Sequence, residues 1–276
     1  MIRWFIKSLK DLDLYHWFTK MRILIFTLIF SLSLQADPPQ DDKKILYTNL
    51  IGSATILTWG VFNWDYGKRG MNASSEGWFG RDTKHLGVDK LGHFYTTFAL
   101  SHYFTNLYEG FGYEKNKAIK QGAISSFLFN TAMEVGDSFS DYGFSYEDFM
   151  INALGSYIGY YLLMHPEVNK KVDIRIEYNP SDKITNGDSY DILTDYNGMK
   201  FLTAIKFDGF ERFQDTFMKY FEFHLGYYTR DENNIPQRYP YAAIGINLSH
   251  LLKPVSKKAS TFFNYYQMPY SYIPYE

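Results

Sequence analysis

Acidic side chains occur beside segments of this chain that are apolar enough to be buried. The stretch EVGDSFSDYGFSYED, residues 134 to 148, carries five carboxylates, and no Lys or Arg occurs from position 121 to position 169. A carboxylate buried without a partner shifts its pKa and becomes neutral. Partners from elsewhere in the fold, a bound cation or water can balance these groups, and the sequence leaves all three open. The carboxylates are Glu134, Asp137, Asp141, Glu147 and Asp148.

Three predicted helices carry polar residues at a spacing of four, which places them on one helix face. If the helices alternate in direction with short loops, the charged ends of these stripes lie at the same level. We therefore expect one polar site inside a helical bundle. The stripes are Asp89, His93, Thr97 and Ser101; Ser126, Asn130 and Glu134; and Asp148, Asn152 and Ser156.

Several chemistries fit this site. Lys90 or His93 can pair with Glu134 or Asp137 in a purely structural role, and helix capping accounts equally well for Asp89 and Asp148. A divalent cation is the second alternative, because carboxylates suit calcium or magnesium and an added imidazole suits zinc or manganese. Acid/base chemistry with His93 as the base is the third. The candidate metal ligands are Glu134, Asp137, His93 and Asp141.

Familiar catalytic motifs are absent from the sequence. It contains no nucleophile elbow, no H-E-x-x-H and no glycine-rich phosphate loop. The run from Asp137 to Asp148 is not an EF-hand, because Phe139 and Tyr142 occupy positions that a calcium loop gives to a ligand and a glycine.

Four apolar segments precede a change of hydrophobic period. They run over 45–62, about 90–108, about 116–134 and 146–165, and predict a four-helix domain over residues 40–168. Asp89 is a good N-cap type for the second, and Ser145 with Asp148 forms a capping box for the fourth.

The following residues favour strands. KVDIRIEY, 171–178, alternates apolar and polar residues, and Asn197-Gly198 predicts a hairpin turn. FEFHLGYYTR and YPYAAIGINLSHL predict another antiparallel pair, with a helix at ERFQDTFMKY before it. The predicted fold is α+β: a four-helix bundle with a polar interior site, an antiparallel β region over 170–252 and a helical, aromatic tail over 253–276.

Composition and the N-terminus restrict the class of protein. The net charge of -2 and the lack of a basic run exclude a nucleic-acid partner, and the 276 residues contain no cysteine. Residues 1–36 predict a leader with a signal peptide, and the basic and apolar parts of that peptide predict a true start at Met21. We therefore expect export to the cell envelope, in the periplasm and associated with a membrane.

The segments DKLGHF (89–94) and EVGDSFSDYGFSYEDFMINALGSYIG (134–159), with GWFG upstream, resemble the YfiM-like family of predicted periplasmic lipoproteins of unknown function. The same pattern is more distantly similar to VanZ-like membrane proteins. The resemblance covers about residues 75 to 163. It implies a signature of Asp89, Lys90, His93, Glu134, Asp137, Ser145, Asp148, Asn152 and Gly155.

The family's lipoproteins carry a lipidated cysteine, which this sequence lacks. Membrane association must therefore use helices or aromatic side chains, and Gly155 with Gly159 gives a spacing that permits close helix packing in a bilayer. We expect a cell-envelope protein whose polar site binds a cation, a lipid head group or a protein partner. The alternative is a metal-dependent hydrolase or transferase that acts on an envelope lipid.

Overall fold

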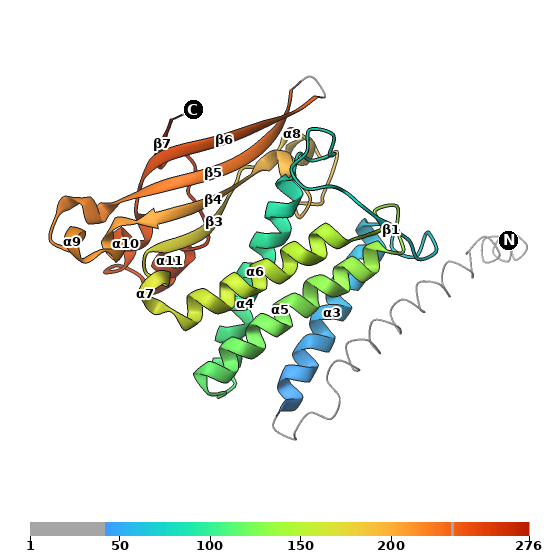
Figure 1. Ribbon diagram of the computed structural model, residues 1–276, viewed down its shortest axis with the longest axis horizontal. Helices are drawn as coiled ribbons and strands as arrows, with labels where there is room; N and C mark the ends of the chain where they lie inside the picture. Colours follow the sequence, from blue (N-terminus) through green and yellow to red (C-terminus); the bar gives the residue numbers. More distant parts are fainter. Residues whose placement is uncertain (1–41, 233–234, 276) are drawn as a thin grey trace, which may run out of the picture. The chain divides into compact units, whose positions relative to one another are not determined.

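The computed structural model describes residues 42–232 and 235–275 (Figure 1). The predicted leader, 1–36, lies outside the described residues. The chain divides into two compact units: Met1–Ser75 with Ile124–Phe149, and Glu76–Ala123 with Met150–Glu276. The domain limits drawn from the sequence stay a prediction.

Each of the four long helices occurs where the sequence predicts one. They are α3 (Lys43–Asn63), α4 (Val88–Gly110), α5 (Lys115–Asp137) and α6 (Tyr146–Met164). With the sheet described below they confirm a mixed helical and antiparallel fold. Their assembly into a single four-helix bundle stays a prediction.

The start of α4 differs from the prediction that Asp89 is its N-cap. Gly87 occupies that position with a φ of 85°, and Asp89 lies in the first turn. Glycine is favoured at Gly87 because the backbone is left-handed there and a Cβ would lie 2.2 Å from the ring of Phe79. The prediction that Asp89 is the N-cap of α4 is therefore wrong, because the backbone places Gly87 at that position.

The first unit is built on α3 and the C-terminal part of α5. Its core contains Ile56, Leu57, Trp64 and Tyr66, packed with Ala132. Two short parallel strands, β1 (Ala73–Ser74) and β2 (Phe144–Ser145), join the loop after α3 to the loop after α5.

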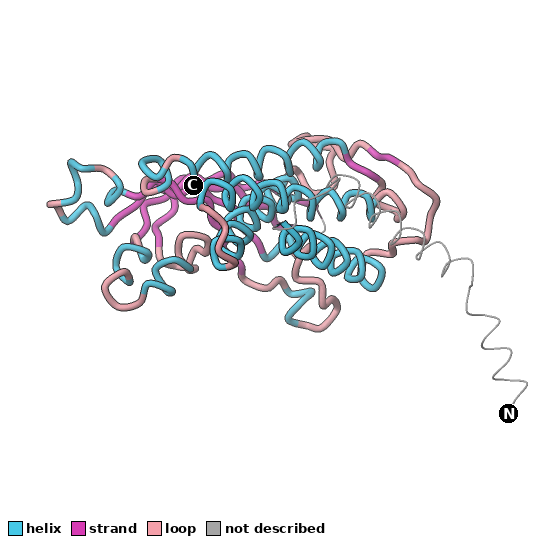
Figure 2. Tube along the Cα trace, turned by 90° about the horizontal axis from the view of Figure 1, so that it is seen from below, coloured by secondary structure: helices cyan, strands magenta, loops and turns pink. Residues whose placement is uncertain are grey.

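The second unit contains a five-stranded antiparallel sheet in the order β3-β4-β5-β6-β7. Figure 2 shows these strands in magenta. The predicted strand at 171–178 and the predicted antiparallel pair after it are confirmed as β3, β5 and β6. The strands are β3 (Val172–Tyr178), β4 (Met199–Lys206), β5 (Phe221–Glu232), β6 (Ile235–Ile246) and β7 (Tyr272–Tyr275).

The hairpin predicted at Asn197-Gly198 is wrong. These residues end the 3-10 helix η2 (Tyr196–Gly198), and β4 pairs with β3 and β5. The segment before the turn forms local contacts in place of a strand, since the Asp191 carboxylate accepts hydrogen bonds from the backbone of Leu193 and the hydroxyl of Thr194. Asx contacts of this kind compete with a strand ladder.

Short helices connect the other elements. The helix predicted at 211–220 is present as two separate pieces, α9 (Glu211–Gln214) and η4 (Phe217–Tyr220). The remaining pieces are α7 (Pro166–Asn169), α8 (Asp182–Thr185), η3 (Phe207–Gly209), α10 (Leu248–Leu252) and α11 (Lys257–Phe262).

Strand β3 buries its polar face more completely than its apolar face. On β3, Asp173, Arg175 and Glu177 are buried, whereas the alternating apolar residues are only half-buried. The apolar face packs against α4, where Val88 contacts the cluster of Met199 and Phe201. The alternation of apolar and polar residues predicted the strand period of β3 correctly, but it did not predict which face of β3 is more buried.

Arg175 lies at the centre of this polar face and is 1% exposed. Its guanidinium donates to Asp173 Oδ2 at 2.6 Å, to both carboxylate oxygens of Glu222 at 2.5 and 2.9 Å, and to Gln267 Oε1 at 3.0 Å. Burial alone would raise the pKa of Glu222, but the hydrogen bond with His224 and the charge of Arg175 lower it. The network therefore holds an ionised carboxylate inside the unit.

Replacement of Arg175 by Met is expected to lower the free energy of unfolding by about 3–5 kcal/mol, because it leaves buried carboxylates without their cation. Arg212→Met is the matched control, since Arg212 is exposed and a surface change of this kind shifts stability by about 0.5 kcal/mol or less. Chemical denaturation measures both values. Equal losses in the two variants would show that the network contributes nothing specific.

Candidate functional site

Most of the polar residues singled out in the sequence are buried, whereas His93 and Asp137 are half-buried and Asp141 is exposed. Thr97, Ser101, Ser126, Asn130 and Asn152 are each 0% exposed, and Glu134 is 1% exposed. Buried polar groups require hydrogen-bond partners. The signature is therefore part of the interior, and its members are described below within the unit to which each belongs.

In the first unit, Glu134 and Asp137 lie at the end of α5 close to Tyr66. The Tyr66 ring is fully buried against Gly60 and Gly136, where a Cβ would lie 2.1 Å from it. Its hydroxyl donates to the Met133 carbonyl at 3.0 Å. Burial, followed by the charge of Asp137, raises the pKa of Tyr66 well above its usual range. The phenol therefore stays protonated and can donate a hydrogen bond beside these two carboxylates.

The start of α6 supplies Ser145, Glu147 and Asp148. The backbone N–H of Asp148 donates to Ser145 Oγ at 3.2 Å, which confirms Ser145 as the cap of this helix. Glu147 is fully buried and accepts hydrogen bonds from Ser75 Oγ at 2.5 Å and from Ser145 Oγ at 3.3 Å. Hydroxyl donors from two segments therefore solvate this carboxylate.

Asp141 has a cationic partner from a distant part of the chain. It forms an ion pair with Arg69, and both side chains are more than half exposed. Exposed pairs of this kind contribute about 0–1 kcal/mol. Arg69 would have to leave before Asp141 could bind a metal ion, so this carboxylate is the weakest of the predicted ligands.

In the second unit, Lys90 and Asp89 lie in the first turn of α4. Lys90 is 0% exposed, and its Nζ lies 2.8 Å from Glu76 Oε2 and 2.9 Å from Asp89 Oδ2. Glu76 precedes the helix by one loop and was not singled out in the sequence. A buried ammonium between two carboxylates has the electrostatic support that burial requires. The predicted pairing of Lys90 with Glu134 or Asp137 stays a prediction.

Asn152 and Gly155 on α6 meet α4 at close range. Thr97 Oγ1 lies 2.9 Å from Asn152 Oδ1. A Cβ at Gly155 would lie 2.5 Å from the Phe94 carbonyl oxygen, and one at Gly159 would collide with the Ser101 hydroxyl. The two glycines predicted to permit close helix packing therefore allow α6 to approach α4 closely.

His93 lies one turn before Thr97, whose hydroxyl donates to the His93 carbonyl at 2.8 Å. The histidine is half-buried. Its role as a general base or a metal ligand stays a prediction, as does the convergence of His93 and Asp89 with Glu134 and Asp148.

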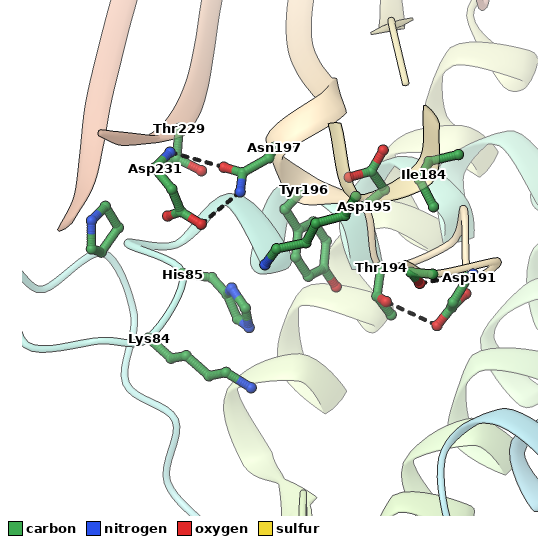
Figure 3. Close-up of a pocket in the computed structure, with 13 residues that line it drawn as sticks. Lys84, His85, Ile184, Asp191, Thr194, Asp195, Tyr196, Asn197, Thr229 and Asp231 are labelled. Carbon is green, nitrogen blue, oxygen red and sulfur yellow. Dashed lines mark hydrogen bonds between the residues drawn. The ribbon is translucent and has the colours of Figure 1, made fainter. Parts of the chain in front are cut away.

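The second unit also contains a polar cavity of about 260 Å³ that the sequence did not predict (Figure 3). His85 lines it with its ring 5.0 Å from that of Tyr196, and burial lowers the pKa of His85. Opposite, Asn197 donates to Asp231 Oδ2 at 2.6 Å and accepts from the Asp231 backbone N–H at 3.1 Å. The lining of the cavity is mostly polar, and its residues are too distant in the chain for a local pattern to reveal.

The segment that contains the signature matches a known protein family. Residues 75–164 match the predicted periplasmic lipoprotein family DUF2279. The match covers about a third of the chain and confirms the resemblance stated from the motifs. The family's description is consistent with the predicted location in the cell envelope. No curated protein and no solved structure matches the chain. The likeness to VanZ-like proteins stays a prediction.

The close contact of α4 and α6 can be tested at Gly155. Gly155→Ala is expected to lower the free energy of unfolding by about 1–3 kcal/mol, because the added methyl must displace the backbone at Phe94.

Gly110→Ala is the matched control, since no atom lies within 4 Å of a Cβ there. It should leave stability unchanged or raise it by up to about 1 kcal/mol, because alanine is the better helix former. Thermal unfolding of the two variants measures the difference. A Gly155→Ala variant as stable as Gly110→Ala would contradict the close approach.

Proposed function

We propose that this chain is a cell-envelope protein that is associated with a membrane through α3. The DUF2279 segment then serves as a polar scaffold that binds a cation, a lipid head group or a protein partner. The alternative, a metal-dependent hydrolase or transferase acting on an envelope lipid, requires a metal that the polar residues hold.

The composition and exposure of α3 carry the proposal. Among the described residues, α3 is the one helix long and apolar enough to cross a membrane. Its 21 residues span about 31 Å, close to the thickness of a bilayer core. Only 33% of its most apolar stretch is buried, whereas the core helix of a soluble domain would be mostly enclosed.

Several of the side chains that α3 exposes are of kinds that bilayers favour. Ile51 is 67% exposed in the middle of the helix. Aromatic side chains are exposed near both ends, with Tyr47 at one end and Trp59 and Phe62 at the other. Tyr and Trp concentrate at the two interfaces of a membrane, so aromatic side chains near both ends support a helix that crosses the membrane.

Ile51→Asp tests the membrane role of α3. At the centre of a membrane helix an aspartate costs about 2.5–3.5 kcal/mol, so the fraction of protein that stays in membranes after alkaline extraction should fall. Asn63→Asp introduces the same side chain at the exposed end of the helix and should leave that fraction unchanged. An Ile51→Asp protein that stays in the membrane like wild type would refute the insertion of α3.

Elemental analysis of the purified full chain separates a structural role of the carboxylates from a metal site. In the scaffold proposal, Glu134→Gln lowers the free energy of unfolding by about 1–3 kcal/mol because it disturbs a buried hydrogen-bonded group, and the metal content is unchanged. Glu109→Gln, on an exposed carboxylate, is the control. A stoichiometric metal that is lost in both Glu134→Gln and His93→Ala, with melting unchanged, would favour the metal-dependent enzyme.

A further inference from the structure

A cavity of about 510 Å³ lies on the polar face of the sheet in the second unit. Its volume falls in the range of about 300–1,000 Å³ that is usual for small-molecule sites. Five tyrosines, two cations and two carboxylates line it together with Asn179 and two prolines. A wall that is both aromatic and charged is suited to a ligand with apolar faces and polar edges.

The sheet register builds the aromatic walls. Glu177, Lys200, Tyr228 and Tyr239 are direct neighbours across β3, β4, β5 and β6. The rings of Tyr228 and Tyr239 are stacked with centroids 5.0 Å apart and an angle of 17°. The cross-strand pairs thus present flat aromatic surfaces along one row of the sheet.

A second stacked pair stands beside the first. Tyr241 and Tyr272 have centroids 5.8 Å apart at 17°. Tyr241 lies over Gly226, where a Cβ would be 2.3 Å from its ring, so the absence of a side chain at Gly226 lets the ring lie close to the sheet. Aromatic faces carry partial negative charge and attract the C–H groups that one face of a sugar ring presents.

The charge of Lys200 is already balanced by Glu177 in the wall of the cavity. Its Nζ lies 3.1 Å from Glu177 Oε1 and donates to Tyr272 Oη at 2.9 Å, and the Tyr272 hydroxyl donates to Glu177 Oε2 at 2.7 Å. Burial raises the pKa of Tyr272 and of Tyr241, so both phenols remain protonated donors. This part of the wall is therefore neutral and supplies hydroxyl groups.

Arg230 is the second cation that lines the cavity. Its Nη1 donates to the carbonyls of Met199 at 3.0 Å and Thr229 at 2.7 Å, and its guanidinium lies 4.7 Å from the centre of the Tyr228 ring. Among the described residues no carboxylate forms an ion pair with it, and its Nη2 and Nε donate no hydrogen bond. A half-buried guanidinium with free donors matches the geometry of a carboxylate or a phosphate.

Tyr270 adds a strained group at the rim. It is 95% exposed and has a φ of 62°, a left-handed conformation that is unusual for a bulky residue. Exposed aromatic rings held in strained backbone are common at ligand-binding sites.

We propose that this cavity binds a saccharide that carries one anionic group. The sugar ring packs against the exposed ring of Tyr270 at the rim of the tyrosine wall, and the carboxylate or phosphate binds the free donors of Arg230. A neutral sugar would offer the free donors of Arg230 no acceptor of opposite charge, and a free cation would meet Lys200 already over the rings of Tyr228, Tyr241 and Tyr272. The inference stands independently of the membrane role of α3.

Titration of the purified full chain with glucuronate, glucose 6-phosphate and glucose, followed by calorimetry and ligand-observed NMR, tests the proposal. We expect at least one anionic sugar to bind about tenfold or more tightly than glucose, since a charge-assisted hydrogen bond to Arg230 distinguishes them. Preference for glucuronate identifies a carboxylate, and preference for glucose 6-phosphate a phosphate. Equal affinities for all three sugars, or no binding at millimolar concentrations, would overturn the proposal.

Variants locate the binding. Arg230→Gln should weaken the preferred anionic sugar about tenfold or more and leave glucose unchanged, whereas Arg212→Gln, outside the cavity, should change neither. Tyr270→Ala removes an exposed ring that the fold does not need, and should weaken the anionic and the neutral sugar by similar factors. Wild-type affinity in both Arg230→Gln and Tyr270→Ala would place the sugar elsewhere and overturn the assignment.

Discussion

The buried guanidinium of Arg175 determines how the second unit is assembled. It joins Asp173 on the same strand, Glu222 on β5 and Gln267 in the C-terminal segment through hydrogen bonds of 3.0 Å or less. The Gln267 backbone N–H also donates to the Ile176 carbonyl at 2.9 Å. These hydrogen bonds to a buried charge hold the C-terminal segment beside β3. That placement brings β7, and with it Tyr272, to the edge of the tyrosine-lined cavity.

Local sequence signals predicted the helices well and the strand details less well. Apolar runs bounded by Ser145 or by His165-Pro166 gave α6 to within a residue, because capping and proline act on neighbouring positions. The alternation in β3 could not show that its polar face is the more buried, since the partners of Arg175 lie 47 and 92 residues away. The prediction of a hairpin at Asn197-Gly198 was wrong for the same reason, because pairing of β4 with β3 outweighs a local turn preference.

The candidate site shows the same division between local and distant information. The spacing of four correctly identified interior positions such as Thr97 and Asn152, because a polar stripe in an apolar helix has to meet other polar groups. Arg69 as the partner of Asp141, and Glu76 as a partner of Lys90, come from loops that no periodicity marks. The tyrosine-lined cavity was missed altogether, since its rings come from three strands and the segment before the last of them.

Because Lys200 is covalently attached to the chain, its ammonium affects which ligands the tyrosine rings can bind. Its ammonium lies 4.9 Å from the centre of the Tyr228 ring and 5.6 Å from that of Tyr272, the geometry in which aromatic cages hold methylated amines. A tethered group has an effective concentration in the millimolar range or above, which a free amine in solution rarely reaches. The chain thus contains its own competitor for cationic ligands, and a choline-like head group finds these rings already occupied.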